Sequence, residues 1–506
     1  MTSDGKAPEA RSTSRPYIMA GLMLTMGLTA MDGTIVATAI PSIVHDLGGF
    51  SLFPWVFSVY LLVQAAMVPI YGKLADVYGR KPMLLIGALI FLLGSMLSGV
   101  SWSMVSLIAF RGLQGVGAAA IIPIATTVVG DLFSIEERAK MQGYLSSVWG
   151  ISAVIGPAIG GFLVQYASWR WVFYINVPIG IAALLMIWLF LHEQVTALRH
   201  MIDYWGSILL MISMAGIILG LLEGGVDWPW VSWQSGTTIG GGMVLIGVFI
   251  GVEARAPEPV IPLWVFGRRV LAIANIGSLV VGVLSIGLSS FLPTFVQGVL
   301  GRSPLVAGFA LATMSIGWPL ASAYSGKLYL KFGFRTTALI GAVLCTLSGA
   351  GFSDLSLHAT VWMVALMSFV MGSGLGLLST SLIVAVQSLV GWNRRGVVTG
   401  SNMFTRMVGS TLGVAVFGSM VNATLVHWFR HTPASIAGKL PKGINASSMI
   451  AGTSTAKVQP QALHFVQQGL YLGIHRVFLA LLFSGVVVLL VELVFPRKPL
   501  PLEDLP

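Results

Sequence analysis

The chain is a succession of long apolar runs separated by short polar breaks, and this pattern limits the folds that it can adopt. Of its 506 residues, 56% are hydrophobic and only 9% are charged. A helix needs about 20 apolar residues to cross the hydrocarbon core of a bilayer. Because so little polar surface is available to face water, the sequence predicts an all-α, polytopic membrane protein.

Fourteen apolar runs are long enough to be transmembrane spans. They lie near residues 17–41, 53–72, 83–101, 104–130, 141–166, 172–192, 205–222, 235–252, 270–297, 306–328, 336–352, 360–388, 398–423 and 471–495. No cleavable signal peptide is expected, because the first apolar run is too long for the core of a signal sequence.

The basic residues predict how these spans are oriented. An even number of spans places both termini on one side of the membrane, and 19 of the 28 lysines and arginines fall in the termini and loops of that side. Loops that carry such an excess of positive charge remain in the cytoplasm. We therefore expect a multi-pass protein of the inner (plasma) membrane with both termini cytoplasmic. The basic residues are dispersed over many loops, which gives no support to nucleic-acid binding.

A short charged stretch occurs twice in the chain. The segment GKLYLKFGFR at residues 326–335 repeats GKLADVYGRK at residues 72–81, at an offset of 254 residues. Two parallel six-span halves follow from such a repeat. The second copy has Leu330 in the position of Asp76, so a latch built on this charge is expected to be asymmetric.

The repeat divides the chain into four segments. We expect a six-helix bundle at residues 1–192, an inserted pair of spans at 193–252, a proline-rich cytoplasmic linker at 253–269, and a second six-helix bundle at 270–506. The second bundle would include a long extracytoplasmic loop at residues 424–470.

The first copy of the repeat lies between two spans and concentrates charge there. Its two glycines, Gly72 and Gly79, allow two helices and their loop to approach closely. The carboxylate of Asp76 can accept hydrogen bonds from the amides of a helix N-terminus or from a neighbouring arginine. The whole stretch resembles motif A of the major facilitator superfamily, which implies a gating role for Gly72, Asp76, Gly79, Arg80 and Lys81.

Four further stretches resemble one branch of that superfamily. They are MDGTIVATAIP at residues 31–41, RGLQGVGAA at 111–119 (motif B), GISAVIGPAIGG at 150–161 (motif C) and FTRMVGSTLGVA at 404–415. The first departs from the usual pattern at Met31 and Thr38. Together they resemble the fourteen-span drug:proton antiporters, of the type that exports quaternary ammonium compounds. The resemblance implies the major facilitator fold and multidrug efflux.

Asp32 is the first candidate for proton coupling. It lies about 22 Å into its span at 1.5 Å per residue, inside the hydrocarbon core. Ionisable groups at that depth are rare and are by default functional candidates. The alternative is an acid that a partner helix neutralises permanently.

Arg111 is the second candidate, at a similar height in the membrane. Its guanidinium keeps its charge, so it needs acceptors inside the bundle. If it pairs with Asp32 in one state and leaves it in the other, a proton gains a reason to bind and to be released. The alternative is that Arg111 only binds backbone carbonyls and holds its neighbouring spans together.

The motif C stretch is expected to form a gating surface. The Gly156-Pro157 pair interrupts a helix, and small residues leave a smooth face on which another helix can rock. That face is expected between the halves, and ordinary close packing is the alternative. The glycines of this face are Gly150, Gly156, Gly160 and Gly161, and Pro157 follows Gly156.

A pocket for bulky amphipathic cations needs aromatic faces and adaptable sulfur. The expected substrate-binding residues are Tyr60, Gln64, Gln114, Trp149, Glu223, Phe404 and Arg406. Glu223 ends its span beside tryptophans, where an interface residue is the alternative. Glu492, near the end of the last span, is expected to face Arg497 or Lys498 and to take no part in transport.

Other classes of protein lack support in the sequence. There is no histidine pair at metal-ligand spacing, no nucleophile elbow and no GxxxxGK[ST] phosphate loop, so neither an enzyme nor an ATP-driven pump is expected. No metal and no cofactor are expected. The expected partners are a small-molecule substrate, protons and membrane lipid, and the chain is expected to act as a monomer. The alternatives are an exporter of an endogenous metabolite, siderophore or lipid, and a proton symporter, against which motif C argues.

Overall fold

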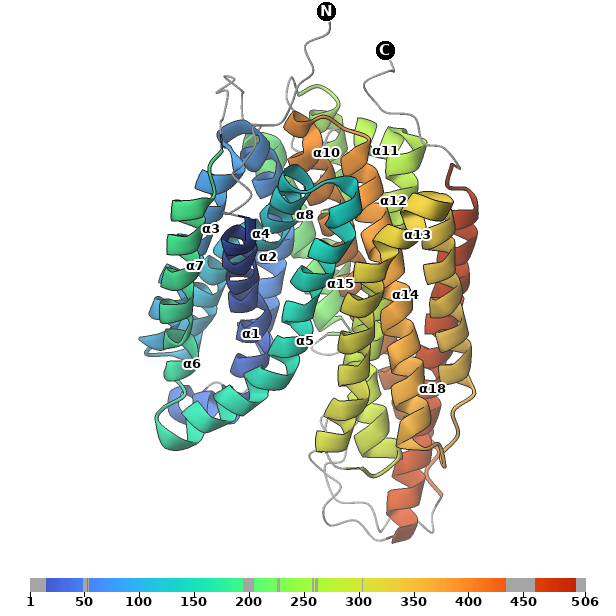
Figure 1. Cartoon of the computed structure of the whole chain (residues 1–506). Helices are drawn as coiled ribbons and strands as arrows, with labels where there is room; N and C mark the ends of the chain where they lie inside the picture. Colours follow the sequence, from blue (N-terminus) through green and yellow to red (C-terminus); the bar gives the residue numbers. More distant parts are fainter. Residues whose placement is uncertain are drawn as a thin grey trace, which may run out of the picture.

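The computed structural model of the chain is a bundle of long helices (Figure 1). The structure describes residues 15–48, 52, 54–193, 204–224, 228–256, 259, 263–302, 304–433 and 460–496. Within these residues the regular structure is helical, and the one β-type contact is an isolated bridge between Gly224 and Trp228.

The helices follow one another along the chain with short connections. The part up to the inserted pair contains α1 (Arg15–Leu47), α2 (Pro54–Tyr78), α3 (Arg80–Gly99), α4 (Met104–Leu132), α5 (Ile135–Tyr166), α6 (Trp171–Tyr174) and α7 (Asn176–Phe190). The inserted pair consists of α8 (Tyr204–Glu223), α9 (Trp233–Ser235), the π-helix η2 (Gly236–Gly240) and α10 (Gly241–Glu253).

The remaining helices form the second half. They are α11 (Trp264–Gly267), α12 (Arg269–Thr294), the π-helix η3 (Phe295–Val299), α13 (Pro304–Ser353), α14 (Val361–Ser388), the 3₁₀ turn η4 (Trp392–Arg394), α15 (Arg395–Arg430) and α18 (Pro460–Leu493).

Each predicted span overlaps a helix of the structure. Eleven helices in the described part of the chain are long and apolar enough to cross a membrane. One of them, α13, contains the two predicted spans at 306–328 and 336–352. The predicted spans at 141–166 and 205–222 correspond to α5 and α8.

The loop expected at residues 424–470 is shorter than predicted. Helix α15 runs on to Arg430, and α18 already begins at Pro460. The reason is packing: Leu425 and Val466 are buried in the core of the second half, and Trp428 stacks on Phe465. Residues 434–459, the middle of that loop, lie outside the described residues.

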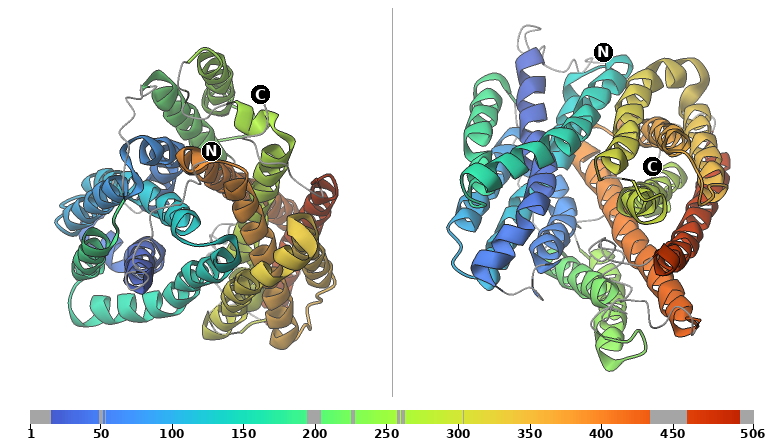
Figure 2. Two further views of the ribbon diagram at one scale, coloured as in Figure 1. Left: turned by 45° about the horizontal axis from the view of Figure 1, so that its top comes forward. Right: turned by 90° about the horizontal axis from the view of Figure 1, so that it is seen from below.

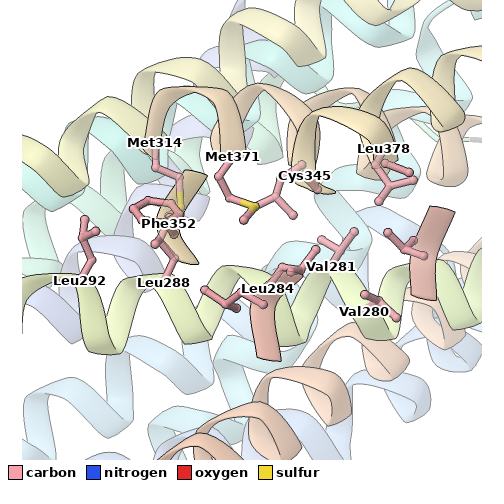
Figure 3. Packing of buried hydrophobic residues seen from close by; sticks show 14 of the residues in the cluster. Val280, Val281, Leu284, Leu288, Leu292, Met314, Cys345, Phe352, Met371 and Leu378 are labelled. Atoms are coloured by element: carbon pink, nitrogen blue, oxygen red, sulfur yellow. The ribbon is translucent and has the colours of Figure 1, made fainter. Parts of the chain in front are cut away.

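Buried apolar side chains gather in two large clusters. One is built mainly from α1 to α5 and α7, with contributions from α8, α10 and α15, and the other from α12 to α18. Figure 3 shows part of the second cluster, where Met314, Met371 and Phe352 lie around Leu284 and Leu288 of α12. The inserted helices α8 and α10 pack on each other, and α8 contacts both α2 and α15 (Figure 2). The inserted pair thus contacts helices from both parts of the chain.

Two glycines explain the repeated sequence stretch. Gly79 has φ 96° and ψ 154°, and Gly333, at the matching place in the second copy, has φ 84° and ψ 161°. Glycine alone adopts this region of φ and ψ at low cost. Gly79 separates α2 from α3, and Gly333 breaks α13 at the corresponding place, so the repeat encodes the same sharp reversal twice.

We expect Gly333→Ala to destabilise the protein. A Cβ at this φ and ψ costs on the order of 1 to 3 kcal/mol, because L-residues avoid this conformation. The measurement is the thermal midpoint of the detergent-purified protein. Gly308→Ala in the same helix is the matched control, because a Cβ there would meet nothing within 4 Å. Equal midpoints for the two variants would contradict the argument.

Candidate functional site

A buried ion pair joins α1 and α4. Nη1 of Arg111 donates to Oδ2 of Asp32 over 2.5 Å and to Oε1 of Gln114 over 2.7 Å. Nε2 of Gln114 donates to the second carboxylate oxygen of Asp32 over 2.8 Å. The three side chains are buried, with at most 1% of each residue exposed. Each carboxylate oxygen of Asp32 therefore has a donor.

Arg111 is also bound to α2. Its Nε donates to the carbonyl of Val56 over 3.1 Å, and its guanidinium lies over the ring of Tyr60, 4.2 Å from the centroid. The structure contains the contacts that both interpretations of Arg111 require. Arg111 pairs with Asp32, and it also binds a backbone carbonyl that ties α4 to α2. Its Nη2 has no hydrogen-bond partner among the described residues.

Glycines bring the helices close enough to form this pair. A Cβ added to Gly94 of α3 would lie 2.7 Å from Cα of Gln114, and one added to Gly115 would lie 2.6 Å from the carbonyl oxygen of Tyr60. Both distances are shorter than van der Waals contact, so only glycine permits these approaches. The ion pair consequently depends on backbone packing of α4 against α2 and α3.

A second cluster links α2 to the start of α15. The backbone amides of Gly396 and Val397 donate to the two carboxylate oxygens of Asp76 over 2.9 and 2.7 Å. Nη2 of Arg80 donates to Asp76 over 2.7 Å and to the carbonyl of Trp392 over 2.6 Å. Asp76 thus has both kinds of partner expected from the sequence, a helix N-terminus and a neighbouring arginine.

Further charged residues surround Arg80. Its Nε lies 3.0 Å from Oδ2 of Asp131 on α4, and its guanidinium lies 3.8 Å from the ring centroid of Trp392. Arg395 at the start of α15 forms an ion pair with Asp131 over 2.9 Å. We call Asp76, Arg80, Asp131 and Arg395 the latch, and the end of the molecule that they occupy the latch end.

Glu193, which was not predicted from the sequence, holds the start of α3 in place. Glu193 accepts hydrogen bonds from the backbone amides of Arg80 and Lys81, each over 2.9 Å. Nζ of Lys81 donates to the carbonyl of Trp188 over 2.6 Å, so it contacts α7 rather than the second half. The available signal for Glu193 was an acid directly after the sixth span.

The latch residues Asp131 and Arg395 were also missed. The signals available in the sequence were an acid at the end of the fourth span and a pair of arginines, Arg394-Arg395, before the thirteenth. Neither position reveals its partner, because Asp131 and Arg395 are 264 residues apart.

The two halves also meet between α5 and α13 at the latch end, and we call this contact the second seam. The Tyr329 hydroxyl donates to the carbonyl of Ile135 at the start of α5. A Cβ added to Gly326 would lie 2.8 Å from Cβ of Ala139, so the two helices are in close contact. Leu330, which replaces the aspartate of the first copy, is 51% exposed. The latch is therefore asymmetric, as the sequence predicted, and a tyrosine makes the cross-contact at this seam.

The motif C glycines do not share one environment. A Cβ on Gly150 would lie 2.8 Å from the carbonyl oxygen of Ser315 on α13, so this residue faces the second half. Gly156 instead packs against Thr34 of α1, and a Cβ on Gly161 would meet nothing within 4 Å. Gly160 is buried, and the side chain of Pro157 lies outside the described residues. The expected single face between the halves is thus corrected to one position, Gly150, since 150 and 156 lie on different sides of the helix.

The residues expected to bind substrate lie in three kinds of place: in the Asp32 cluster, at other buried positions, and at partly or half-exposed positions. Tyr60 and Gln114 belong to the Asp32 cluster, and Gln64, one turn beyond Tyr60 on α2, is buried. Phe404 of α15 is buried in the core cluster of the first half, and Trp149 on α5 is about half exposed, at 46%. The others are Glu223 at the end of α8, partly exposed, and Arg406, also partly exposed, whose Nη2 lies 3.6 Å from the sulfur of Met403.

Tyr329→Phe tests the second seam. Removing the hydroxyl leaves the carbonyl of Ile135 without its donor and should cost on the order of 1 kcal/mol at this contact. Spin labels at the exposed positions Lys140 and Lys331 should then report a broader and longer distance distribution. Because the native Cys345 is buried, the spin labels attach to the cysteines introduced at these positions. Tyr324→Phe, at a residue 61% exposed, is the control. Identical distributions in the two variants would show that the Tyr329 hydroxyl does not hold α5 and α13 together.

No group of three histidine, cysteine, aspartate or glutamate side chains in the described part of the chain is arranged to hold a metal ion. The described residues instead hold a buried carboxylate paired with an arginine, and several charged contacts between helices of different halves.

Known proteins are similar to this chain in sequence and in fold. Two transporters of Bacillus subtilis (strain 168) are similar in sequence: Multidrug resistance protein 3 is 40% identical over 81% of this chain and 80% of its own length, and the multidrug transporter MdtP is 35% identical over 82% and 77%. The proton:xylose symporter XylE has a similar structure, with a TM-score of 0.63, 14% identity and coverage of 98% of this chain and 99% of its own.

The human organic anion transporter MFSD10 also has a similar structure, with a TM-score of 0.60, 13% identity and coverage of 92% of this chain and 99% of its own. These likenesses in structure show the fold. The model of the Major Facilitator Superfamily matches residues 22–414. With its long helices, its repeated charged stretch and its relatives among multidrug transporters, the chain belongs to the Major Facilitator Superfamily.

Proposed function

We propose that the protein is a secondary active exporter that exchanges protons for small amphipathic compounds, with lipophilic cations as the main class. The observation that carries this proposal is the buried Asp32–Arg111 pair in two membrane-spanning helices. The names of the related multidrug transporters support the export of small molecules.

The ion pair suggests how a proton is coupled to transport. A charge removed from water needs its partner, and breaking a buried pair by neutralising one member costs about 3 to 5 kcal/mol. A proton therefore binds Asp32 only when α1 and α4 move so that Arg111 finds other acceptors. Gln114 and the carbonyl of Val56 are already bound to Arg111 and supply part of that replacement.

The latch supports an assignment of the conformational state. The contacts of Asp76 and of Tyr329 both join the two halves at one end of the molecule. We propose that this end is cytoplasmic, following the distribution of basic residues, and that the conformation faces outward. Hydrogen bonds to a charged group contribute about 1.5 to 3 kcal/mol each, so a few such contacts suffice to set the balance between two states.

Asp32→Asn should abolish uphill efflux, because asparagine keeps the shape of the side chain but cannot exchange a proton. The protein should still fold and should still equilibrate substrate downhill. The measurement is the transport of a cationic dye in energised inverted vesicles, with a parallel assay of downhill exchange in the absence of a proton gradient.

Asp354→Asn serves as the matched control, because Asp354 is exposed beyond the end of α13. Normal accumulation by the Asp32 variant would remove this residue from the mechanism. Loss of downhill exchange as well would mean that Asp32 serves folding or substrate binding rather than coupling.

Asp76→Asn should shift the population toward the inward-facing state, because the amides of Gly396 and Val397 lose a charged acceptor at the positive end of a helix. Spin labels at Tyr78 and Lys331, both exposed at the latch end, should report a longer distance. Glu137→Gln is the control, since its ion pair with Arg15 joins two helices of the same half over 3.7 Å. An unchanged distance distribution in the Asp76 variant would contradict the latch.

The charge of the cargo depends on which side chains it meets. Asp32 favours cations, although in this conformation its carboxylate is fully occupied by Arg111 and Gln114. One observation favours anionic or zwitterionic cargo instead: Arg406 on α15 contacts the sulfur of Met403 and has no carboxylate within 4 Å among the described residues. Competition between cationic and anionic dyes in the same vesicle assay distinguishes the two.

A further inference from the structure

Glu492 is a buried acid that the Asp32 pair does not involve. It is the penultimate residue of α18, and none of its surface is exposed. Neither carboxylate oxygen has a hydrogen-bond partner in the described part of the chain. The expected partners, Arg497 and Lys498, lie outside the described residues. The expected contact with these two residues therefore stays a prediction, and the structure shows in addition that the side chain is buried inside the bundle.

The space around the carboxyl group is apolar and is made by a glycine. A Cβ added to Gly277 of α12 would lie 2.7 Å from Oε1 of Glu492 and 2.6 Å from a methyl group of Leu382 on α14. Any larger residue at 277 would therefore collide with the acid. Glu492 thus occupies a fitted site between three helices of the second half.

The nearby cations bind backbone carbonyls instead of the carboxyl group. Arg269 at the start of α12 donates to the carbonyl of Val494 over 3.1 Å, and Arg335 of α13 donates to that of Leu493 over 2.6 Å. Helix α14 carries no charged residue, and Arg395 at the start of α15 forms its ion pair with Asp131. No basic side chain of the described residues lies within 4 Å of the carboxyl oxygens.

Among the residues that the structure describes, a charged carboxylate in such a site would have neither a donor nor a counter-ion, which is the most costly way to bury an acid. A neutral carboxylic acid fits it without that cost. Asp32 has the opposite environment, with a donor on each oxygen. The environments of these two acids favour opposite protonation states, so one acid can carry a proton while the other is ionised in the same conformation.

We propose that Glu492 is a second proton-binding site of the transporter, which carries a proton in this conformation while Asp32 is ionised. The inference deepens the proposed proton-coupled export and rests on it. It adds a site in the second half of the molecule, at the latch end, where the chain's resemblance to other exporters assigned none.

Infrared spectroscopy of the purified protein in lipid nanodiscs tests the proposal directly. A protonated carboxylic acid has a C=O stretching band distinct from that of a carboxylate. We expect the difference spectrum between the unmodified protein and Glu492→Gln to contain such a band at neutral pH, and we expect this difference band to disappear reversibly as the pH is raised. Glu136→Gln is the matched control, because Glu136 is exposed and a hydrogen bond from Ser134 holds the pKa of its carboxyl below the usual range.

Two results would overturn the proposal. If the difference spectrum between the unmodified protein and Glu492→Gln contains no such band, Glu492 is ionised, for example through a pair with Arg335. A band that Glu492→Gln removes but that persists at every pH at which the protein stays folded shows a permanently neutral, structural acid. The infrared result does not depend on transport, so it stands apart from the dye assay on Asp32→Asn.

Discussion

The structure depends on one constraint, that every charge placed inside an apolar bundle needs a partner there. Water is absent from the core of a bilayer, so an unpaired ion costs several kcal/mol. The chain meets this constraint with few charges, gathered in small groups. Asp32 and Arg111 satisfy each other and bind α1 to α4, with α2 held through the carbonyl of Val56. A protonation change at such a pair cannot remain local, because the helices that carry it must rearrange.

The same constraint acts differently where the two halves meet. Asp76 is bound by two amides at the N-terminus of α15, where the helix dipole adds to the hydrogen bonds. Arg80 then holds both Asp76 and Asp131, and Arg395 brings the second half to Asp131 as well. The charges of the latch are thus shared across the seam, and separating the halves exposes all of them together. Such a contact favours two discrete states over a continuous range.

The sequence predicted the helices and the family because these rest on local patterns. Apolar length, the repeated glycine and the charged motif are all readable within a few dozen residues. The pairing of Asp32 with Arg111 was also within reach, since both are rare intramembrane charges at a similar depth. The partners of Asp76 were predicted only in kind, because Gly396 is 320 residues away in the sequence. The burial of Glu492 was not predicted, since a sequence does not show which way a residue near a helix end is turned.

Helix α15 gives these observations a mechanical consequence. It is a single helix of 36 residues, about 54 Å long at 1.5 Å per residue. One end is capped by Asp76, the middle packs closely on α12 at Gly282, and the far end is fixed to α18 through Trp428 and Phe465. A rod held along its length by α12 and α18 moves together with these two helices. We expect that release of the capped end lets this half turn as one body. As its latch end moves away from α2, its opposite end moves toward the first half, so one face of the membrane opens while the other closes.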